Sequence, residues 1–423
     1  MIYKIYINRC FITFLLGITL IVSFAYSQKI EENEKLRENS VKVFIKCSVC
    51  DMDFMRDEIQ FVNYVRMQED ADVYILSTAQ STASNGYEYT FYFIGQNHFN
   101  GINDTLKLST NVSESSDNKR VKITNLIKLG LIRYVEKSKI SDYLNISLDL
   151  PKEKQEIKDV WKQWYFQISS DVYANGEKMY KSTSLWSSIS ANKITPDWKY
   201  EFSVSNSYSG HWYKIDDTTE ITSATTRYSF YNLIVKSISE HWSIGENIDA
   251  YTSNYSNIKL SASFLPAIEY NIYPFSESNR RQFRFLYGVG VLQNYYIDTT
   301  LYMKTKEFLF LQSFKAGYKQ IETWGSLSIV SYYSNYLNNF KLNNLSLNLL
   351  FTLTVANGLS INLNGGASLV HDQINLPKTG ASDDEILTRQ RQLESQYTYW
   401  VSGGLSFSFG SIYNNIVNPR FDL

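Results

Sequence analysis

The chain has 423 residues, of which 15% are aromatic, including 33 tyrosines and 24 phenylalanines. Its 41 basic and 42 acidic side chains nearly balance, which argues against a nucleic-acid-binding surface or a polybasic lipid-binding patch. Beyond the N-terminal region no run of about 18 apolar residues occurs, so no further membrane-spanning helix is expected. If the mature chain resides in a membrane, it must do so as a β-barrel.

Residues 1–27 have the pattern of a secretory signal peptide. Two basic residues precede an apolar stretch from Phe11 to Phe24, and Ala25 and Ser27 supply small residues at the −3 and −1 positions of a cleavage site. Cleavage there removes Cys10 and places the mature chain in an oxidising compartment outside the cytoplasm. An uncleaved membrane anchor is the alternative interpretation.

Residues 28–150 predict a small periplasmic α/β domain, because strand and helix periodicities follow one another in this region. Four segments are expected to be strands: VKVFIKC, ADVYILSTAQST, YEYTFYFIGQ and DTLKLST. The middle two flank Ser84-Asn85-Gly86, which is a hairpin signal. Two segments are expected to be helices: DMDFMRDEIQFVNYV, with Asp51 as its N-cap, and KRVKITNLIKLGLIRYVEKS. The expected core positions are Met55, Ile59 and Val62 in the first helix and Ile123, Ile127, Leu131 and Tyr134 in the second.

Residues 151–163 are charged and form the expected linker to a second region, residues 164–423, in which strand alternation dominates. DWKYEFSVS shows the pattern: Trp198 and Tyr200 share one face, whereas Lys199 and Glu201 lie on the other. The same alternation recurs down to the stretch YTYWVSGGLSFSFGS near the C-terminus. The region predicts about twelve antiparallel strands.

Apolar and polar residues alternate along the strands of both a soluble β-sandwich and a transmembrane β-barrel, so other features must distinguish the two folds. From Leu342 to Val370 the sequence contains no Asp, Glu, Lys or Arg, although sheets that face water normally carry charges. Many strands are long enough to cross a bilayer, and short connections alternate with longer ones. We therefore predict an α+β protein: the small α/β domain followed by an antiparallel transmembrane β-barrel in the outer membrane.

Five charged residues fall on the face that would line the barrel lumen: Lys199, Glu201, Lys259, Glu269 and Arg284. Charges in a lumen must be hydrated or paired. Two interpretations therefore remain open. The five side chains line a channel and tune its selectivity, or they form a salt-bridge network that fills a narrow barrel.

Several segments resemble uncharacterised outer-membrane β-barrel proteins of the Bacteroidota. They are the signal peptide, YPFSESNRRQFRFLYGVG and the ending LSFSFGSIYNNIVNPRF. The resemblance covers most of the region after Pro151, includes no catalytic motif, and implies outer-membrane residence without an assigned substrate. The order of elements in residues 28–150 is similar, at the level of fold, to small periplasmic α/β domains such as the N-terminal domain of TolB.

Cys47-Ser-Val-Cys50 is the sharpest local motif, and it falls where a strand is expected to meet a helix. A thioredoxin-like redox site normally has a cis-proline facing its cysteines, but residues 41–150 contain no proline. A zinc site lacks ligands, because His98 is the only histidine of this domain. We predict a local disulfide between Cys47 and Cys50, with redox activity and metal binding as alternatives.

The leading functional hypothesis is passage or binding of a small solute by an outer-membrane barrel that carries a periplasmic domain. Its expected partner is outer-membrane lipid, with no cofactor, metal or nucleic acid. In a second hypothesis the barrel is an anchor and the periplasmic domain docks a protein partner. In a third the protein is a membrane-embedded hydrolase that uses a serine and one of the histidines His211, His241 and His371.

Overall fold

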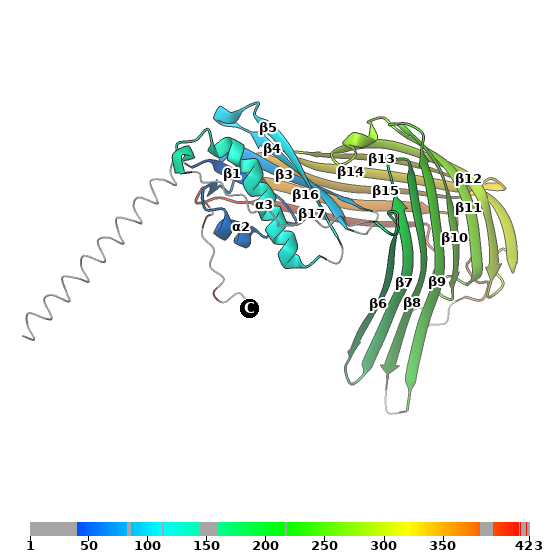
Figure 1. Ribbon diagram of the computed structural model, residues 1–423. Helices are drawn as coiled ribbons and strands as arrows, with labels where there is room; N and C mark the ends of the chain where they lie inside the picture. Colours follow the sequence, from blue (N-terminus) through cyan, green and yellow to red (C-terminus); the bar gives the residue numbers. More distant parts are fainter. Residues whose placement is uncertain are drawn as a thin grey trace, which may run out of the picture. The chain divides into compact units, whose positions relative to one another are not determined.

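The computed structural model describes residues 40–82, 86–111, 114–143, 159–215, 218–356, 358–380, 392–413, 415 and 420. The chain forms two compact units. The smaller unit comprises Met1–Thr78, Tyr89–Lys154 and Ser408–Leu423, and the larger comprises Ala79–Glu88 and Gln155–Phe407 (Figure 1). The predicted signal peptide, Ser84, Asn85 and most of the predicted linker lie outside the described residues.

The small unit contains a five-stranded mixed sheet in the order β2-β1-β3-β4-β5, which confirms the predicted α/β character. Strand β1 runs parallel to both β2 and β3. The strands are β1 (Lys42–Lys46), β2 (Asn63–Tyr64), β3 (Val73–Ser81), β4 (Tyr87–Gly95) and β5 (Asn103–Thr110). The helices are α2 (Met52–Glu58), α3 (Ser116–Val135) and the 3₁₀ turns η1 (Gln68–Asp70), η2 (Asn97–Phe99) and η3 (Ser141–Tyr143).

Helix α3 supplies much of the core of the small unit. Ser115 caps it by accepting a hydrogen bond from the backbone N of Asn118 at 3.2 Å. The predicted apolar stripe is confirmed, because its four members, Ile123 to Tyr134, are at most 2% exposed. The Tyr134 hydroxyl donates to the carbonyl of Ile102 at 2.8 Å, and burial raises the pKa of Tyr134 to about 12.

The first predicted helix is too long. Helix α2 ends at Glu58, and the remainder of the predicted helix forms the short strand β2. Asp51 is the N-cap as predicted, accepting from the backbone N of Phe54 at 3.0 Å. Asn63 and Tyr64 pair with β1 instead, and the Tyr64 hydroxyl donates to the carbonyls of Met55 and Ile59 at the end of α2. Local periodicity could not show that β1 would offer these residues an edge to pair with.

The large unit is a twelve-stranded antiparallel meander, so the predicted number and type of strands are confirmed. A 3₁₀ turn, η4 (Phe275–Glu277), lies between two of the strands. The strands are β6 (Tyr165–Gly176), β7 (Tyr180–Ile194), β8 (Trp198–Lys214), β9 (Glu220–Ser237), β10 (Trp242–Ser253), β11 (Ile258–Asn271), β12 (Arg281–Tyr296), β13 (Lys306–Glu322), β14 (Gly325–Tyr336), β15 (Asn339–Ala356), β16 (Leu359–Val370) and β17 (Tyr397–Phe407).

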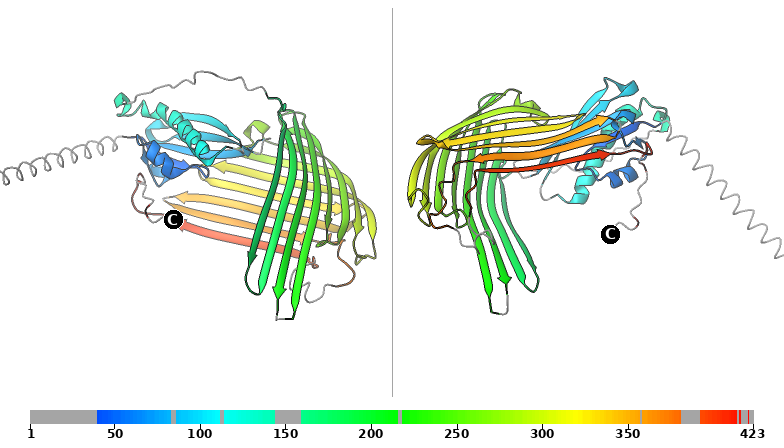
Figure 2. Two further views of the ribbon diagram at one scale, coloured as in Figure 1. Left: turned by 60° about the horizontal axis from the view of Figure 1, so that its bottom comes forward. Right: turned by 180° about the vertical axis from the view of Figure 1, so that it is seen from behind.

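The sheet is curved but not closed (Figure 2). Each strand pairs with its neighbours in sequence, and β6 and β17 are the two edges. The structure therefore contains the predicted meander without the β6–β17 pairing that a barrel requires. The connection between β8 and β9 is short, because β8 continues to Lys214 and β9 starts at Glu220.

After β17 the chain joins the small unit. Tyr413 forms an antiparallel bridge with Val65, and the backbone N of Arg66 donates to the carbonyl of Ile412 at 2.9 Å. The Asn415 side chain accepts from the backbone N of Tyr64 at 2.7 Å. This segment thus occupies the outer edge of β2, which would otherwise present unpaired backbone groups.

Close packing of Gly130 in α3 generates the first prediction. A Cβ atom built on Gly130 would overlap the ring of Phe93, which is fully buried. Although Ala favours helices by about 1 kcal/mol over Gly, the overlap should cost about 1–3 kcal/mol. Gly130→Ala should therefore raise hydrogen exchange across α3 and β4, measured by mass spectrometry on the full chain. Asn125→Ala, at an exposed position of the same helix, is the control and should leave exchange unchanged or lower it; equal exchange in both variants would contradict the packing argument.

Candidate functional site: the polar face of the large sheet

The register of the sheet places small polar residues of successive strands side by side. Ser188 of β7 pairs with Ser205 of β8, which pairs with Ser229 of β9. The hydroxyls of Ser205 and Ser229 are 2.7 Å apart. We call this side of the sheet the polar face, because the same register continues through the Ser- and Asn-bearing positions of β15 to β17.

The opposite side of the sheet, the apolar face, exposes large hydrophobic side chains. Ile168 is 80% exposed and Val204 is 56% exposed. Glu246 is an exception on this face, since it pairs with Ile234 and Pro266. Further exposed members across the sheet are Val172, Ile189, Phe230, Ile244, Phe264, Ile268, Val289, Phe310, Phe314, Leu345, Leu347, Leu363, Tyr399, Val401 and Leu405. An apolar surface of this extent marks a contact with lipid or protein.

Near the ends of two strands, lysines extend over tryptophans. The Nζ of Lys236 lies 5.3 Å from the ring centroid of Trp198, and the Nζ of Lys193 lies 6.0 Å from that of Trp164. Lysine and tryptophan both combine an apolar body with a polar tip. This pairing suits the boundary between an apolar medium and water.

Four of the five predicted charged residues form two pairs. Lys199 Nζ lies 2.9 Å from Glu201 Oε1 on β8. Arg284 of β12 lies 3.9 Å from Glu269 of β11. All four side chains are partly exposed, so each pair remains accessible to water. Lys259 instead lies at a register irregularity between Ile258 and Leu260, and it forms no ion pair with the described residues.

Sequence analysis missed further charges on this face. Arg227 stacks over the ring of Tyr251 at 4.0 Å, and Asp249, two residues before Tyr251 on β10, pairs in register with Tyr231 of β9. Lys315 and Lys319 of β13 belong to the same face through their pairing with Tyr332 and Ser328 of β14. Alternation in β9, β10 and β13 is interrupted by polar residues on both sides, so their faces could be assigned only from the pairing register.

One connection runs past the ends of several strands. We call residues 371–378, which follow β16, the strap. Asp372 accepts a hydrogen bond from the side chain of Asn344 on the polar face of β15, at 3.2 Å. The Asn375 side chain donates to the carbonyl of Ser256 in the β10–β11 turn at 2.8 Å, and Pro377 bridges to Thr300 in the β12–β13 loop. The strap therefore links the ends of strands that are far apart in the sheet order.

The three histidines of the large sheet have different partners. His211 Nε2 lies 3.2 Å from the hydroxyl of Ser209, and its Nδ1 lies 3.0 Å from the hydroxyl of Tyr180. His241 Nδ1 faces the carbonyl of Asn271 at 2.8 Å, and His371 Nδ1 lies 3.3 Å from the side-chain oxygen of Asn343. Only His211 therefore meets a serine hydroxyl within the part of the chain described here.

A cavity of about 740 Å³ lies at the β6–β7 hairpin, beside His211. Tyr180, Ser182 and Tyr213 line it together with residues of the hairpin and of the β8–β9 end. The rings of Tyr180 and Tyr213 are 5.1 Å apart. The hydroxyl of Tyr180 thus connects the cavity wall to the histidine.

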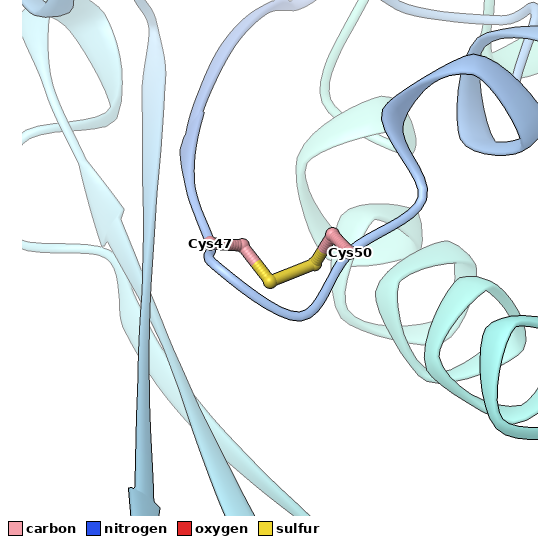
Figure 3. Close-up of a disulfide and its surroundings, with 2 residues drawn as sticks. All are labelled: Cys47 and Cys50. Carbon is pink, nitrogen blue, oxygen red and sulfur yellow. A yellow bond between two sulfur atoms is a disulfide. The ribbon is translucent and has the colours of Figure 1, made fainter. Parts of the chain in front are cut away.

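Cys47 and Cys50 form a disulfide at the turn between β1 and α2 (Figure 3). Both cysteines are partly buried against the core of the small unit. The bond closes the turn that leads from the strand to the N-cap Asp51. This position fixes the start of α2 relative to β1.

No family model matches this chain, and no curated protein matches it. Among the described residues no helix is long and apolar enough to cross a membrane. No cluster of His, Cys, Asp and Glu suited to a metal ion is found within the same residues.

The disulfide generates the second prediction. Because Cys47 and Cys50 enclose a very short loop, its loss should cost the small unit only about 1–2 kcal/mol. Cys47→Ser should raise hydrogen exchange in α2 and leave the large sheet unchanged, as measured by mass spectrometry on oxidised full-length protein. Ser48→Ala, inside the same turn, serves as the control. Quantitative alkylation of both thiols without reductant would show that the bond does not form.

Proposed function

We propose that the protein is an outer-membrane β-barrel that passes small polar solutes, with its α/β unit in the periplasm. The barrel forms when β6 pairs with β17 and closes the twelve-stranded sheet. The observation that carries the proposal is the separation of the two faces: one exposes large hydrophobic side chains and the other carries small polar residues and paired charges.

The apolar face supports a lipid environment. Fully exposed, these side chains would make a soluble protein prone to aggregation. The stretch Leu342–Val370, which covers most of β15 and all of β16, contains no charged residue and matches a lipid-facing wall. The lysine–tryptophan contacts, which both lie at the same edge of the sheet, fit one interface of a bilayer, where lysines extend toward water.

Closure follows from the same environment. In lipid, unpaired backbone groups along β6 and β17 would each cost several kcal/mol. Pairing them removes both edges of the sheet at once. The number of strands in the meander is even, as in bacterial single-chain barrels, so the start of β6 and the end of β17 belong to the same membrane side.

A hydrated lumen follows from the pairs on the polar face. Lys199–Glu201 and Glu269–Arg284 are partly exposed, so water can solvate both partners. Small Ser and Asn side chains leave room beside them. Such a lumen admits ions and small polar solutes, and its charges set the preference between cations and anions.

The third prediction tests passage. Wild-type protein should fractionate with the outer membrane, migrate differently on gels before and after boiling, and show discrete conductance in a planar bilayer. Glu201→Lys replaces an anion of the lumen by a cation and should shift the reversal potential toward anion selectivity. Glu246→Lys, which changes charge equally on the apolar face, is the control and should leave selectivity unchanged.

Two results would decide against passage. Recovery of the protein in the soluble periplasm without detergent would refute the barrel. A silent bilayer with correctly folded protein would leave the barrel but favour the second role, in which it anchors a periplasmic domain that docks a partner.

A second candidate function rests on the contacts of His211. With its Nδ1 hydrogen donated to Tyr180, Nε2 can accept the proton of Ser209 while the Ser209 oxygen attacks a carboxylic ester. The histidine then passes that proton to the departing alcohol, and water releases the acyl group from the serine. The nearby cavity, which Tyr180 lines and which Ser209 and His211 do not, has the volume to hold a small ester.

The fourth prediction tests this alternative. A fluorophosphonate probe should label wild-type protein, and Ser209→Ala should abolish labelling. His211→Asn should slow labelling by about a hundredfold or more, because it removes the base. Ser205→Ala, which removes another polar-face hydroxyl, should label normally. Equal labelling of wild type and Ser209→Ala would refute the hydrolase.

A further inference from the structure

We infer that the strap bars the mouth of the pore and restricts passage to ions and solutes of about monosaccharide size. The inference rests on the proposed barrel and names its solute class. Three observations carry it: the contacts of the strap, the burial beneath it, and the order of the strands that it connects.

The strap is held by defined hydrogen bonds. Asn257 is the centre: its Nδ2 donates to the carbonyls of Asn375 and Asp298 at 2.9 and 3.0 Å, and its Oδ1 accepts from the backbone N of Asp298 at 2.7 Å. Asn257 has a φ of 57°, a conformation that Asn tolerates better than most residues. The strap, the β10–β11 turn and the β12–β13 loop therefore meet at one buried side chain, which is 5% exposed.

Two backbone contacts extend this junction. The backbone N of Leu301 donates to the carbonyl of Leu376 at 2.9 Å, and the backbone N of Lys378 donates to that of Thr299 at 2.8 Å. With the Thr300–Pro377 bridge they form a short antiparallel pairing between strap and loop. A pairing of this kind holds the strap in one position.

Burial shows that this junction covers the polar face. Ile258 of β11 pairs in register with Ser253 of β10 and with Tyr296 of β12, which places Ile258 and Tyr296 on the polar face, and they are only 2% and 4% exposed. Ile374 and Leu376 of the strap are 4% and 5% exposed. At the other end of the strap, Asp372 contacts Asn344 on the polar face of β15. Apolar burial therefore holds the strap against the side that becomes the lumen.

The order of the strands shows where the strap would lie in a closed barrel. The strap begins in the connection between the last two strands of the meander, and it meets the β10–β11 turn, which connects the fifth and sixth of the twelve. In a closed ring of twelve strands these two connections lie opposite each other. The mouth of such a barrel is on the order of 24 Å across, from the spacing and tilt of the strands. Strap and turn thus meet across its diameter and divide it.

A divided mouth selects by size. Each opening is about half of the full mouth, before side chains narrow it further. Hydrated ions and monosaccharides pass an opening of this size, whereas a trisaccharide is excluded. Polar residues of the strap, such as Asp372 and Asn375, leave the openings hydrated.

The fifth prediction tests the strap in two independent ways. In Thr300→Cys/Pro377→Cys, the bridged positions are close enough for a disulfide. It should form in intact cells and be visible as a reductant-sensitive gel shift. Replacement of residues 372–378 by a Gly–Ser segment of equal length should raise single-channel conductance in KCl by about twofold, because it opens both halves of the mouth.

Solute uptake by proteoliposomes supplies the size measurement. Wild-type protein should admit glucose and exclude raffinose, and the Gly–Ser variant should admit both. Asn375→Ala, which removes the side-chain hydrogen bond to Ser256 of the β10–β11 turn and keeps the backbone bond to Asn257, should admit raffinose partially. Asn338→Ala is the matched control. It removes an asparagine side chain of the β14–β15 turn that accepts a hydrogen bond from the backbone N of Phe310, and it should behave as wild type.

The outcomes distinguish a failure of the strap inference from a failure of the proposed passage through the barrel. If the cysteine pair crosslinks but neither wild type nor the Gly–Ser variant conducts, passage is refuted. If wild type conducts and the Gly–Ser variant has the same conductance and the same size limit, the strap inference is overturned. Failure of the cysteine pair to crosslink in folded protein also overturns it.

Discussion

The large sheet depends on one geometric constraint, the alternation of side chains along a pleated strand. Because successive side chains point to opposite faces, a shift of β8 by one residue against its neighbours would move Lys199 and Glu201 to the apolar face. The pairing register keeps every strand of the meander consistent with its neighbours. Two surfaces of different chemistry follow from that register, and the proposed lipid contact and lumen both depend on them.

The same constraint explains why the connections carry the specific features. Each strand side chain points to one face or the other, and most contact only the neighbouring strands. The strap is not part of a strand, so it can cross the ends of several strands and contact Asn257. In the small unit, the segment around Tyr413 similarly leaves β17 and pairs with β2. Both segments satisfy backbone groups that the sheets by themselves leave unpaired.

The polar face also shows how charge pairing and hydration combine. Lys199–Glu201 and Glu269–Arg284 neutralise each other locally, yet all four side chains remain partly exposed. Exposed pairs contribute little to stability, about 0–1 kcal/mol each. Their arrangement is therefore better explained by an aqueous surface than by a need to hold the sheet together.

Periodicity in the sequence was sufficient for the strand number and the α3 core stripe, because both depend on local alternation. The ion pairs Lys199–Glu201 and Glu269–Arg284 became visible only in the structure. Periodicity failed for the second half of the first predicted helix, where Tyr64 and the edge of β1 override helical spacing. It also missed Arg227 and Asp249, whose face depends on register. The strap and the contact of Ser209 with His211 required tertiary structure, because the first joins residues more than a hundred positions apart and the second depends on side-chain orientation.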